Sequence, residues 1–399
     1  MANSPAPHRV LVVGGGTAGI TVAARLRRRG VENVTVLDPA VTHYYQPLWT
    51  LVGGGQADIR HTGRPEANVI PKGVEHVPEA ATEIDPDGKV VTTAGGRKLP
   101  YEALVLAPGL QLDFGGVPGL IEALAEGPVS SNYRADLAPR TWELIRGMRS
   151  GTAVFTQPAG PIKCAGAPQK IAYLAADHWR REGVLGDIRI VLVLPDPVMF
   201  KVPVWAARLE RVAARYGIEV RRSSELVTVD GRTAHIVDHT TGTKETLPFD
   251  LLHAVPPQAA PDFVKANPLA NPENPYGYVD VDQYTLRHKR FPDVFALGDV
   301  ADLPTSKTGA AIRKQAPVVV ENLMAVLAGR EPQARYDGYT SCPLVTARDK
   351  MLLAEFGYDL KPAPTIPFLD TTKERRDMWL LKRYGLPAFY WHAMLPGLA

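Results

Sequence analysis

Cysteine is scarce in this sequence, because the 399 residues include only Cys164 and Cys342. A small secreted scaffold held together by disulfides carries many more cysteines in a shorter chain. We also expect no secretory signal peptide, since residues 1–7 are uncharged and the β-branched run 10–13 follows almost at once. We therefore expect a cytoplasmic origin.

Long apolar runs and one-sided charge are missing as well. No stretch of about 18 apolar residues appears, so we expect no membrane-spanning helix. The formal net charge is only +3, without a basic tract or an RNA-type aromatic motif, so we expect no nucleic-acid partner. We expect no metal site either. With 45% apolar and 22% charged residues, the chain is long enough for two or three domains with large cores.

A glycine-rich turn lies between the first predicted strand and helix. In G-x-G-x-x-G, the first glycine permits a sharp turn, the second lets the backbone approach a pyrophosphate, and the third lets helix and strand pack closely. The phosphates then lie at the helix N-terminus, which favours anions. An acid that ends the next strand is placed to accept a hydrogen bond from a ribose hydroxyl. The predicted contacts are Gly14, Gly15, Gly16, Thr17, Ala18, Gly19 and Asp38.

A second segment favours FAD over NAD. Gly298 and Asp299 end a predicted strand, and in two-domain flavoproteins such a strand returns to the FAD domain. Lys307 begins the following helix, where a positive charge near the flavin would raise its reduction potential; the alternative is a solvated surface lysine. The further predicted FAD contacts are Ala107, Pro108, Gly109, Gly298, Asp299, Lys307 and Thr308.

These elements predict an α/β fold with two Rossmann-like domains of the disulfide-reductase type and a C-terminal membrane-associating segment. The first FAD-binding part covers 8–113. The second Rossmann-like domain covers 114–284, and the chain returns to the FAD domain over 285–330. The C-terminal region, 331–399, contains Cys342.

The second α/β unit has no glycine motif of its own. Its first strand continues into residues 156–168, where three prolines replace the permissive glycines. A pyrophosphate would find no cradle of free N–H groups, so we infer that electrons do not come from a nicotinamide. Cys164 lies in this segment just before a helix, and Lys163 and Lys170 would favour its thiolate.

Cys342 lies in a segment that we expect to be a loop outside both units. Two inert buried thiols are the alternative reading of the cysteines. A lysine-flanked helix start in a flavoprotein without a nicotinamide motif favours a redox pair that reacts with sulfur instead.

At these residues the chain resembles the sulfide:quinone oxidoreductases, in the branch that includes the mitochondrial enzymes. The matching stretches are HYYQPLWTLVG (43–53), KCAGAPQK (163–170), LPTSKT (303–308) and YDGYTSCPL (336–344).

The resemblance implies FAD-dependent oxidation of hydrogen sulfide and electron transfer to a membrane quinone. It implies that Cys164 is the flavin-side cysteine and that sulfide reaches Cys342, with the oxidised pair bridged through sulfur. The resulting persulfide passes its sulfur to a small-molecule acceptor. It also implies that Gln46 and Lys307 contact FAD. Some members attach FAD through a third cysteine, which this chain lacks, so we expect noncovalent FAD.

The segment 373–399 mixes basic and aromatic residues, a composition typical of a segment in the lipid headgroup layer. Its basic residues are Lys373, Arg375, Arg376, Lys382 and Arg383. We expect a protein peripheral to the cytoplasmic membrane, and a folded flavoprotein after removal of this segment. A helix docked on the core and a homodimer contact are the alternatives. Pro387 and Pro396 should limit any helix here to short pieces.

Three other functions compete with this prediction. A type II NADH:quinone oxidoreductase would need the missing second glycine motif. A flavocytochrome-type sulfide dehydrogenase would need a signal peptide and a haem partner. The third alternative is a non-enzymatic, flavin-bound structural or sensor protein. In such a protein the sequence surroundings of the two cysteines would have no functional meaning.

Overall fold

The computed structural model describes residues 8–399, and its larger sheet has seven strands in the order β5-β2-β1-β8-β7-β6, with β19 also paired to β8. Strands β1, β2, β5, β8 and β19 pair in parallel, whereas β6, β7 and β8 form an antiparallel meander. The strands are β1 (His8–Val13), β2 (Val34–Leu37), β5 (Glu75–Val77), β6 (Ala81–Asp85), β7 (Val90–Thr93), β8 (Lys98–Leu106) and β19 (Val294–Ala296).

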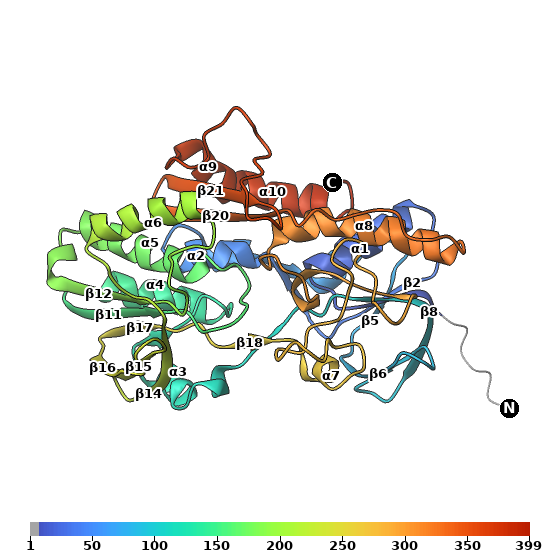
Figure 1. Cartoon of the computed structure of the whole chain (residues 1–399), viewed down its shortest axis with the longest axis horizontal. Helices are drawn as coiled ribbons and strands as arrows, with labels where there is room; N and C mark the ends of the chain where they lie inside the picture. Colours follow the sequence, from blue (N-terminus) through green and yellow to red (C-terminus); the bar gives the residue numbers. More distant parts are fainter. Residues whose placement is uncertain (1–7) are drawn as a thin grey trace.

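The parallel strands of this sheet are buried and rich in valine and leucine, as strands covered on both faces are. Helices α1 (Thr17–Arg28) and α8 (Gly309–Leu327) pack beside each other against it (Figure 1). The expected βαβ unit at the start of the chain is therefore confirmed.

The second sheet has five parallel strands in the order β10-β17-β11-β12-β13. A three-stranded antiparallel sheet of β14, β15 and β16 lies next to it. The elements are β10 (Val129–Ser130), β11 (Gly151–Thr156), β12 (Ile188–Val193), β13 (Glu219–Arg221), β14 (Ser224–Asp230), β15 (Thr233–Asp238), β16 (Lys244–Pro248), β17 (Leu251–His253), α3 (Leu120–Glu126), α4 (Leu137–Gly147), α5 (Ala167–Arg181) and α6 (Pro203–Tyr216).

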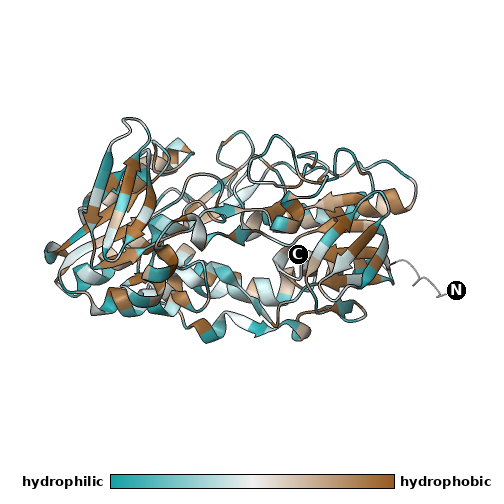
Figure 2. Ribbon diagram, turned by 90° about the horizontal axis from the view of Figure 1, so that it is seen from below, coloured by the Kyte–Doolittle hydropathy of each residue, from teal (hydrophilic) through white to brown (hydrophobic). Residues whose placement is uncertain are grey.

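Short elements join these units, and hydrophobic residues concentrate on the strands of both large sheets (Figure 2). β9 pairs with β18 between the two units, and β3 pairs with β4 beside the first sheet. These elements are β3 (Thr42–Tyr44), β4 (Gly63–Pro65), β9 (Gln111–Leu112), β18 (Gln258–Ala259), α2 (Trp49–Gly53) and α7 (Asp262–Lys265). The mixed α/β architecture with two Rossmann-type units agrees with the sequence prediction.

The C-terminal region lies across both units (Figure 1). It consists of the antiparallel hairpin β20 (Thr340–Ala347) and β21 (Lys350–Phe356), followed by α9 (Arg376–Leu380) and α10 (Leu386–Phe389). Cys342 therefore lies in a strand, and its expected position in a loop is wrong. The alternation of buried side chains along β20 is weak because the strand is buried almost throughout, so the sequence shows no clear two-residue period.

The expectation of short helical pieces in the tail is also wrong. Residues 376–394 form one continuous helical run in which π-helical turns precede and follow α10. Pro387 lies at the start of α10, directly after the first π turn. A proline lacks an N–H donor and crowds the carbonyl four residues earlier, and the wider turn before it accommodates the ring.

Most large apolar side chains of the tail are buried against the core of the first unit. They are Met378, Trp379, Tyr390, Trp391, Met394 and Leu395. Leu380 and Tyr384 remain exposed. The tail thus docks on the core, which was the alternative to a purely lipid-facing segment. Among residues 8–399, no helix has the length and apolar character needed to span a membrane.

A buried polar chain also ties the tail to the glycine turn. The Tyr390 hydroxyl lies 2.9 Å from Thr17 Oγ1, in the first turn of α1, and 2.5 Å from His43 Nε2. On the other side of its ring, His43 Nδ1 lies 3.1 Å from the Gly15 carbonyl and 3.4 Å from Glu66 Oε2. Each group is buried or partly buried, so losing one partner leaves the others unsatisfied.

Removal of the chain from residue 373 onward should therefore abolish a stable flavoprotein. Burying each large apolar side chain contributes roughly 1.5–3 kcal/mol, and six of them together approach a typical total stability of about 5–15 kcal/mol. The measurement is soluble yield, melting temperature and retained flavin. Deletion of Leu398 and Ala399 alone is the control and should preserve all three. A truncated protein that stays folded and yellow would contradict the docking argument.

Candidate active site

The glycine turn after β1 has the geometry that its sequence predicts. Gly14 has a φ of +107°, and a Cβ there would lie 2.3 Å from the Ala107 carbonyl oxygen. A Cβ on Gly19 would lie 1.8 Å from the Gly14 oxygen. A Cβ on Gly16 would meet no atom within 4 Å. Two glycines thus permit close packing, and the third leaves open space at the N-terminus of α1.

Asp38 is fixed beside this turn. Its Oδ2 accepts a hydrogen bond from the Gly15 N–H at 2.5 Å, and its Oδ1 accepts one from the Ala40 N–H at 2.7 Å. The carboxylate is thereby held at the end of β2, next to the open space at Gly16. This is the position from which an acid reaches a ribose hydroxyl.

The structure brings the second predicted FAD segment to the same turn. β19 pairs with β8 with Ala296 opposite Leu106, so Gly298 follows two residues later, next to the Ala107–Gly109 turn. Gly298 has a φ of +74°, and a Cβ there would lie 3.3 Å from the Cβ of Ala18. Its N–H donates to Gln315 Oε1 on α8 at 2.9 Å. Segments about 280 residues apart in the sequence therefore meet at the start of α1.

Lys307 is buried, so its reading as a solvated surface lysine is wrong. Its Nζ donates to the carbonyls of Asp299 at 2.6 Å and Ala301 at 3.1 Å, and it lies 3.6 Å from the centre of the Tyr278 ring. Burial lowers the pKa of Lys307 to about 8, although Asp299 opposes the shift. The lysine thus joins the Gly298–Asp299 turn to the start of α8.

Thr308 caps α8, because its Oγ1 accepts a hydrogen bond from the Ala311 N–H at 3.1 Å. The same oxygen lies 2.9 Å from Thr340 Oγ1 in β20. The helix start is therefore fixed to the strand that contains Cys342. The open space at Gly16, the free N-terminus of α1 and the placed Asp38 together fit the pyrophosphate and ribose of FAD.

The two cysteines meet although 177 residues separate them in the sequence. Cys164 lies in the loop before α5, and the Cys342 thiol is within hydrogen-bonding reach of its sulfur. Cys342 is completely buried, whereas Cys164 is partly exposed. Donation from Cys342 holds the pKa of Cys164 well below the usual range, and the same contact and burial raise the pKa of Cys342.

The Cys164 backbone is strained and fixed. Its φ is +56°, in the left-handed region that non-glycine residues rarely adopt. Its N–H donates to the Lys307 carbonyl at 2.9 Å, and its carbonyl accepts from the Ala167 N–H at 2.7 Å. The cysteine loop is thereby attached directly to the segment that returns to the FAD domain.

Two buried lysines lie at the cysteine pair. Lys170, in the first turn of α5, donates from Nζ to Cys164 Sγ at 3.0 Å. Lys382 comes from the tail helix and donates to the Pro47 carbonyl at 2.7 Å. Both positive charges lower the pKa of Cys164. Burial and the nearby Lys170 lower the pKa of Lys382 to about 7.

Lys382 was assigned from composition to a lipid-facing basic set, and this assignment is wrong. It follows the buried Met378 and Trp379 by four and three residues, so helical periodicity places all three on one face. Lys163, which the sequence placed beside the thiolate, instead donates from Nζ to Gln46 Oε1 at 2.7 Å. Gln46 and Lys163 therefore connect the two units next to the cysteines.

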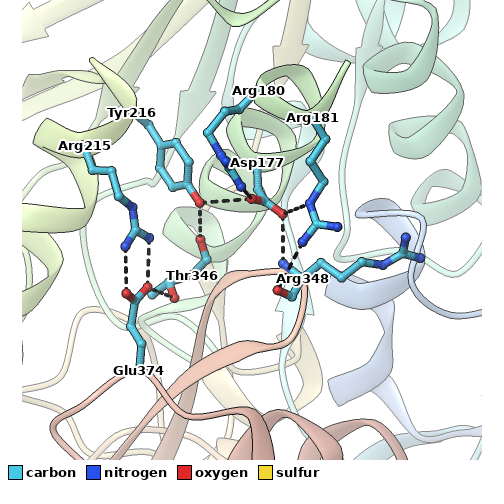
Figure 3. Close-up of polar contacts among 8 residues, drawn as sticks. All are labelled: Asp177, Arg180, Arg181, Arg215, Tyr216, Thr346, Arg348 and Glu374. Atoms are coloured by element: carbon cyan, nitrogen blue, oxygen red, sulfur yellow. Dashed lines mark hydrogen bonds and ion pairs between the residues drawn. The ribbon is translucent and has the colours of Figure 1, made fainter. Parts of the chain in front are cut away.

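A polar network fixes the β20–β21 hairpin to the second unit (Figure 3). Asp177 on α5 accepts hydrogen bonds from the Arg348 N–H at the hairpin turn and from Arg181 Nε, both at 3.0 Å. The Tyr216 hydroxyl on α6 donates to the Thr346 carbonyl at 3.0 Å. α5 begins just after Cys164, so these bonds hold Cys342 in register with it.

A further pair of contacts joins the same hairpin to the tail. Arg215 on α6 forms a bidentate ion pair with Glu374 at 2.7 and 2.8 Å, and Glu374 also accepts a hydrogen bond from the Thr346 hydroxyl (Figure 3). The network thus continues from α6 through β20 to the residues just before α9.

Several backbone donors of the loop between β11 and α5 are already paired with protein groups. The N–H groups of Ala159 and Lys163 donate to Glu225 and Gln258 side chains at 2.7 and 2.9 Å. A Cβ on Gly160 would lie 2.4 Å from the Tyr276 hydroxyl oxygen, and one on Gly166 would lie 2.4 Å from Leu344. Protein groups therefore occupy the place where a second dinucleotide would need free N–H groups and space.

Comparison with known proteins agrees with this fold and with the FAD-binding turn. The family model described as pyridine nucleotide-disulphide oxidoreductase matches residues 8–321. The mitochondrial sulfide:quinone oxidoreductase of Mus musculus is 40% identical over 98% of this chain and 87% of its own, and that of Dictyostelium discoideum is 38% identical over 98% and 86%. The crystal structure of the Aquifex aeolicus sulfide:quinone oxidoreductase has the same fold, with a TM-score of 0.84, 21% identity, and coverage of 99% and 93%.

The Mus musculus and Dictyostelium discoideum relatives extend the match from the glycine turn to the tail helix that contains Lys382. The chain belongs to the sulfide:quinone oxidoreductase family of FAD-binding flavoproteins, within the pyridine nucleotide-disulphide oxidoreductases.

Proposed function

We propose that the protein oxidises hydrogen sulfide to sulfane sulfur at Cys164 and Cys342 and delivers the electrons to a membrane quinone. The observation that carries this proposal is the contact between the two thiols beside the buried Lys170 and Lys382. A thiolate, not a thiol, is the reactive form of cysteine, and positive charges in a buried site stabilise it.

The two cysteines have different roles in this proposal. Hydrosulfide attacks the oxidised pair at Cys342, so one sulfur–sulfur bond forms there and the bond toward Cys164 breaks. Cys342 then holds a persulfide, and Cys164 leaves as a thiolate that Lys170 and Lys382 stabilise. A small nucleophilic acceptor takes the outer sulfur of the persulfide. Return of the pair to its oxidised state releases two electrons.

FAD, when bound, would supply the two-electron chemistry that links the cysteine pair to quinone. The residues that we assign to FAD are the glycine turn with Thr17 and Ala18, Asp38, Gln46, Ala107–Gly109, Gly298, Asp299, Lys307 and Thr308. With both cysteines in the redox pair, no third thiol is left for a covalent link, so we assign noncovalent contacts alone. Burial raises the pKa of Asp299, and Lys307 beside it supplies a positive charge at this end of the site.

The alternative function, oxidation of NADH, has less support. A nicotinamide dinucleotide would need the backbone donors of the loop before α5, and Glu225 and Gln258 already accept those of Ala159 and Lys163. Leu344 and Tyr276 occupy the space beside the glycines of this loop.

The proposal also includes a position on the cytoplasmic membrane, a small-molecule sulfur acceptor and a homodimer.

The first test of the proposed function compares sulfide with NADH and NADPH as electron donors. Sulfide should bleach the visible flavin absorbance of the purified enzyme rapidly, whereas NADH and NADPH at micromolar concentration should leave it unchanged, because the second unit offers no dinucleotide cradle. Anaerobic stopped-flow spectroscopy measures both. Rapid bleaching by NADH would favour the alternative function.

Replacement of each cysteine by serine separates their roles. Cys164→Ser and Cys342→Ser should each lower sulfide-dependent quinone reduction at least about a hundredfold, because each removes one sulfur of the pair. Both variants should retain FAD. Iodoacetamide should label Cys164 in the Cys342→Ser variant, since its thiolate is partly exposed, and should label Cys342 poorly in the Cys164→Ser variant. Near-normal turnover in either variant removes that cysteine from the mechanism.

Replacement of Lys382 by methionine should affect turnover mainly at acid pH. The lysine is charged below its pKa of about 7, and there its charge lowers the pKa of Cys164. Without it the thiolate is lost at a higher pH, so activity at pH 6 should fall more than activity at pH 9. Lys382→Arg should restore part of the acid limb, and Lys373→Met, at an exposed tail lysine, should leave the profile unchanged. A uniform loss at all pH values would make Lys382 structural only.

A further inference from the structure

A concave feature lies between the C-terminal end of α1, the middle of α8 and the end of the tail, and none of its lining residues belongs to the cysteine site. It is a cavity of about 300 Å³. Pro317, Val318 and Ala334 contribute an apolar floor. Four arginines contribute to its wall, and we call it the arginine pocket: Arg25, Arg28, Arg29 and Arg335.

The charges in this pocket are unbalanced. Glu321 is the acidic residue in its lining, and it pairs with Arg29 at 3.0 Å where both side chains are more than half exposed. Arg28 donates to the Pro396 carbonyl at 2.7 Å, which is a neutral acceptor. The excess of guanidinium groups over carboxylates favours an anionic ligand.

Arg25 supplies a separate observation. Its Nε is buried and has no hydrogen-bond partner within residues 8–399. Burial and the charge of Arg29 both lower the pKa of Arg25, and a bound anion would offset both effects. The helix dipole alone explains basic residues at a helix C-terminus. Arg27, whose Nε is likewise buried without a partner among residues 8–399, lies outside the pocket lining and donates from Nη1 to the Val31 and Glu32 carbonyls. Arg335 comes from a different segment and lines the same cavity, and its guanidinium also lies 4.3 Å from the centre of the Tyr284 ring and near the Asp282 carboxylate.

We propose that the arginine pocket binds the phosphate group of an acidic ligand, through the guanidinium groups of Arg25, Arg28, Arg29 and Arg335. Planar guanidinium forks match phosphate oxygens in pairs. The apolar floor fits the carbon atoms next to a phosphodiester. Leu398, 60% exposed, follows Gly397 at the edge of the pocket. These features favour the headgroup of an acidic phospholipid as the source over free phosphate.

The test uses the full-length holoenzyme and isothermal titration with three probes. They are dihexanoyl phosphatidylglycerol, the zwitterionic dihexanoyl phosphatidylcholine, and inorganic phosphate. The phosphatidylglycerol should bind with one-to-one stoichiometry and more tightly than the other two. Equal binding of inorganic phosphate assigns the pocket to the free anion, which is the same chemistry from another source. Binding of neither anionic probe overturns the proposal.

Two double arginine variants test whether phosphatidylglycerol binds in the arginine pocket. Arg25→Gln combined with Arg335→Gln should weaken phosphatidylglycerol binding roughly tenfold or more. Arg208→Gln combined with Arg211→Gln on α6 removes the same charge elsewhere and should leave binding unchanged. Sulfide-dependent quinone reduction in detergent should be unchanged in both double variants. Equal binding by the pocket variant and the wild type would refute the assignment.

The wild-type protein gives an independent readout if the pocket variant fails to fold. Phenylglyoxal modifies accessible arginines, and mass mapping gives the rate at each. Phosphatidylglycerol or phosphate should slow the modification of Arg28 and Arg335 while that of Arg211 stays constant. Unchanged rates at Arg28 and Arg335 would contradict the proposal.

Discussion

The arrangement of the active site depends on one electrostatic constraint, which is the burial of two ammonium groups beside a cysteine sulfur. Removing a charge from water costs several kcal/mol unless a partner replaces the solvent. Lys170 and Lys382 are both almost fully buried, and both positive charges act on the Cys164 sulfur. Lys170 donates to that sulfur directly, and Lys382 donates one hydrogen bond to the Pro47 carbonyl. The low pKa of Cys164 and the low pKa of Lys382 are therefore two consequences of the same arrangement.

This constraint explains why the C-terminal region belongs to the proposed catalytic site. The hairpin contributes Cys342, and the tail helix contributes Lys382. Both are held by polar contacts to other elements: Asp177 and Tyr216 fix the hairpin to the second unit, and Tyr390 fixes the tail to the glycine turn. A region that composition describes as a surface segment thus completes a site built on the two Rossmann-type units.

The local patterns of the sequence predicted much of the fold and the cofactor cradle. The turn at Gly14 and the strand before Gly298 have short-range signals that depend on backbone geometry, and the structure agrees with them. The same is true of the helix that follows Cys164. The bounds of the four domain segments and the individual FAD contacts stay predictions, because they depend on how distant segments divide and on a bound ligand.

Other features depend on tertiary contacts that no local pattern contains. Cys342 was misplaced in a loop because a strand buried on both faces shows no alternation. Lys382 was read as exposed because composition ranks lysine as a surface residue. The His43–Tyr390 bond joins residues 347 positions apart, and only the docked tail makes it visible.

Complete burial of Cys342 has a consequence for access. A sulfur atom without solvent-exposed surface selects its reactants by size, because a hydrosulfide ion has a single heavy atom and passes where a thiol on a larger molecule does not. The bond from the Cys164 N–H to the Lys307 carbonyl joins the two units at this point, so opening by a hinge between them would break a contact of the reaction centre itself. A larger acceptor therefore cannot reach the Cys342 sulfur in this arrangement unless the side chains that cover it move.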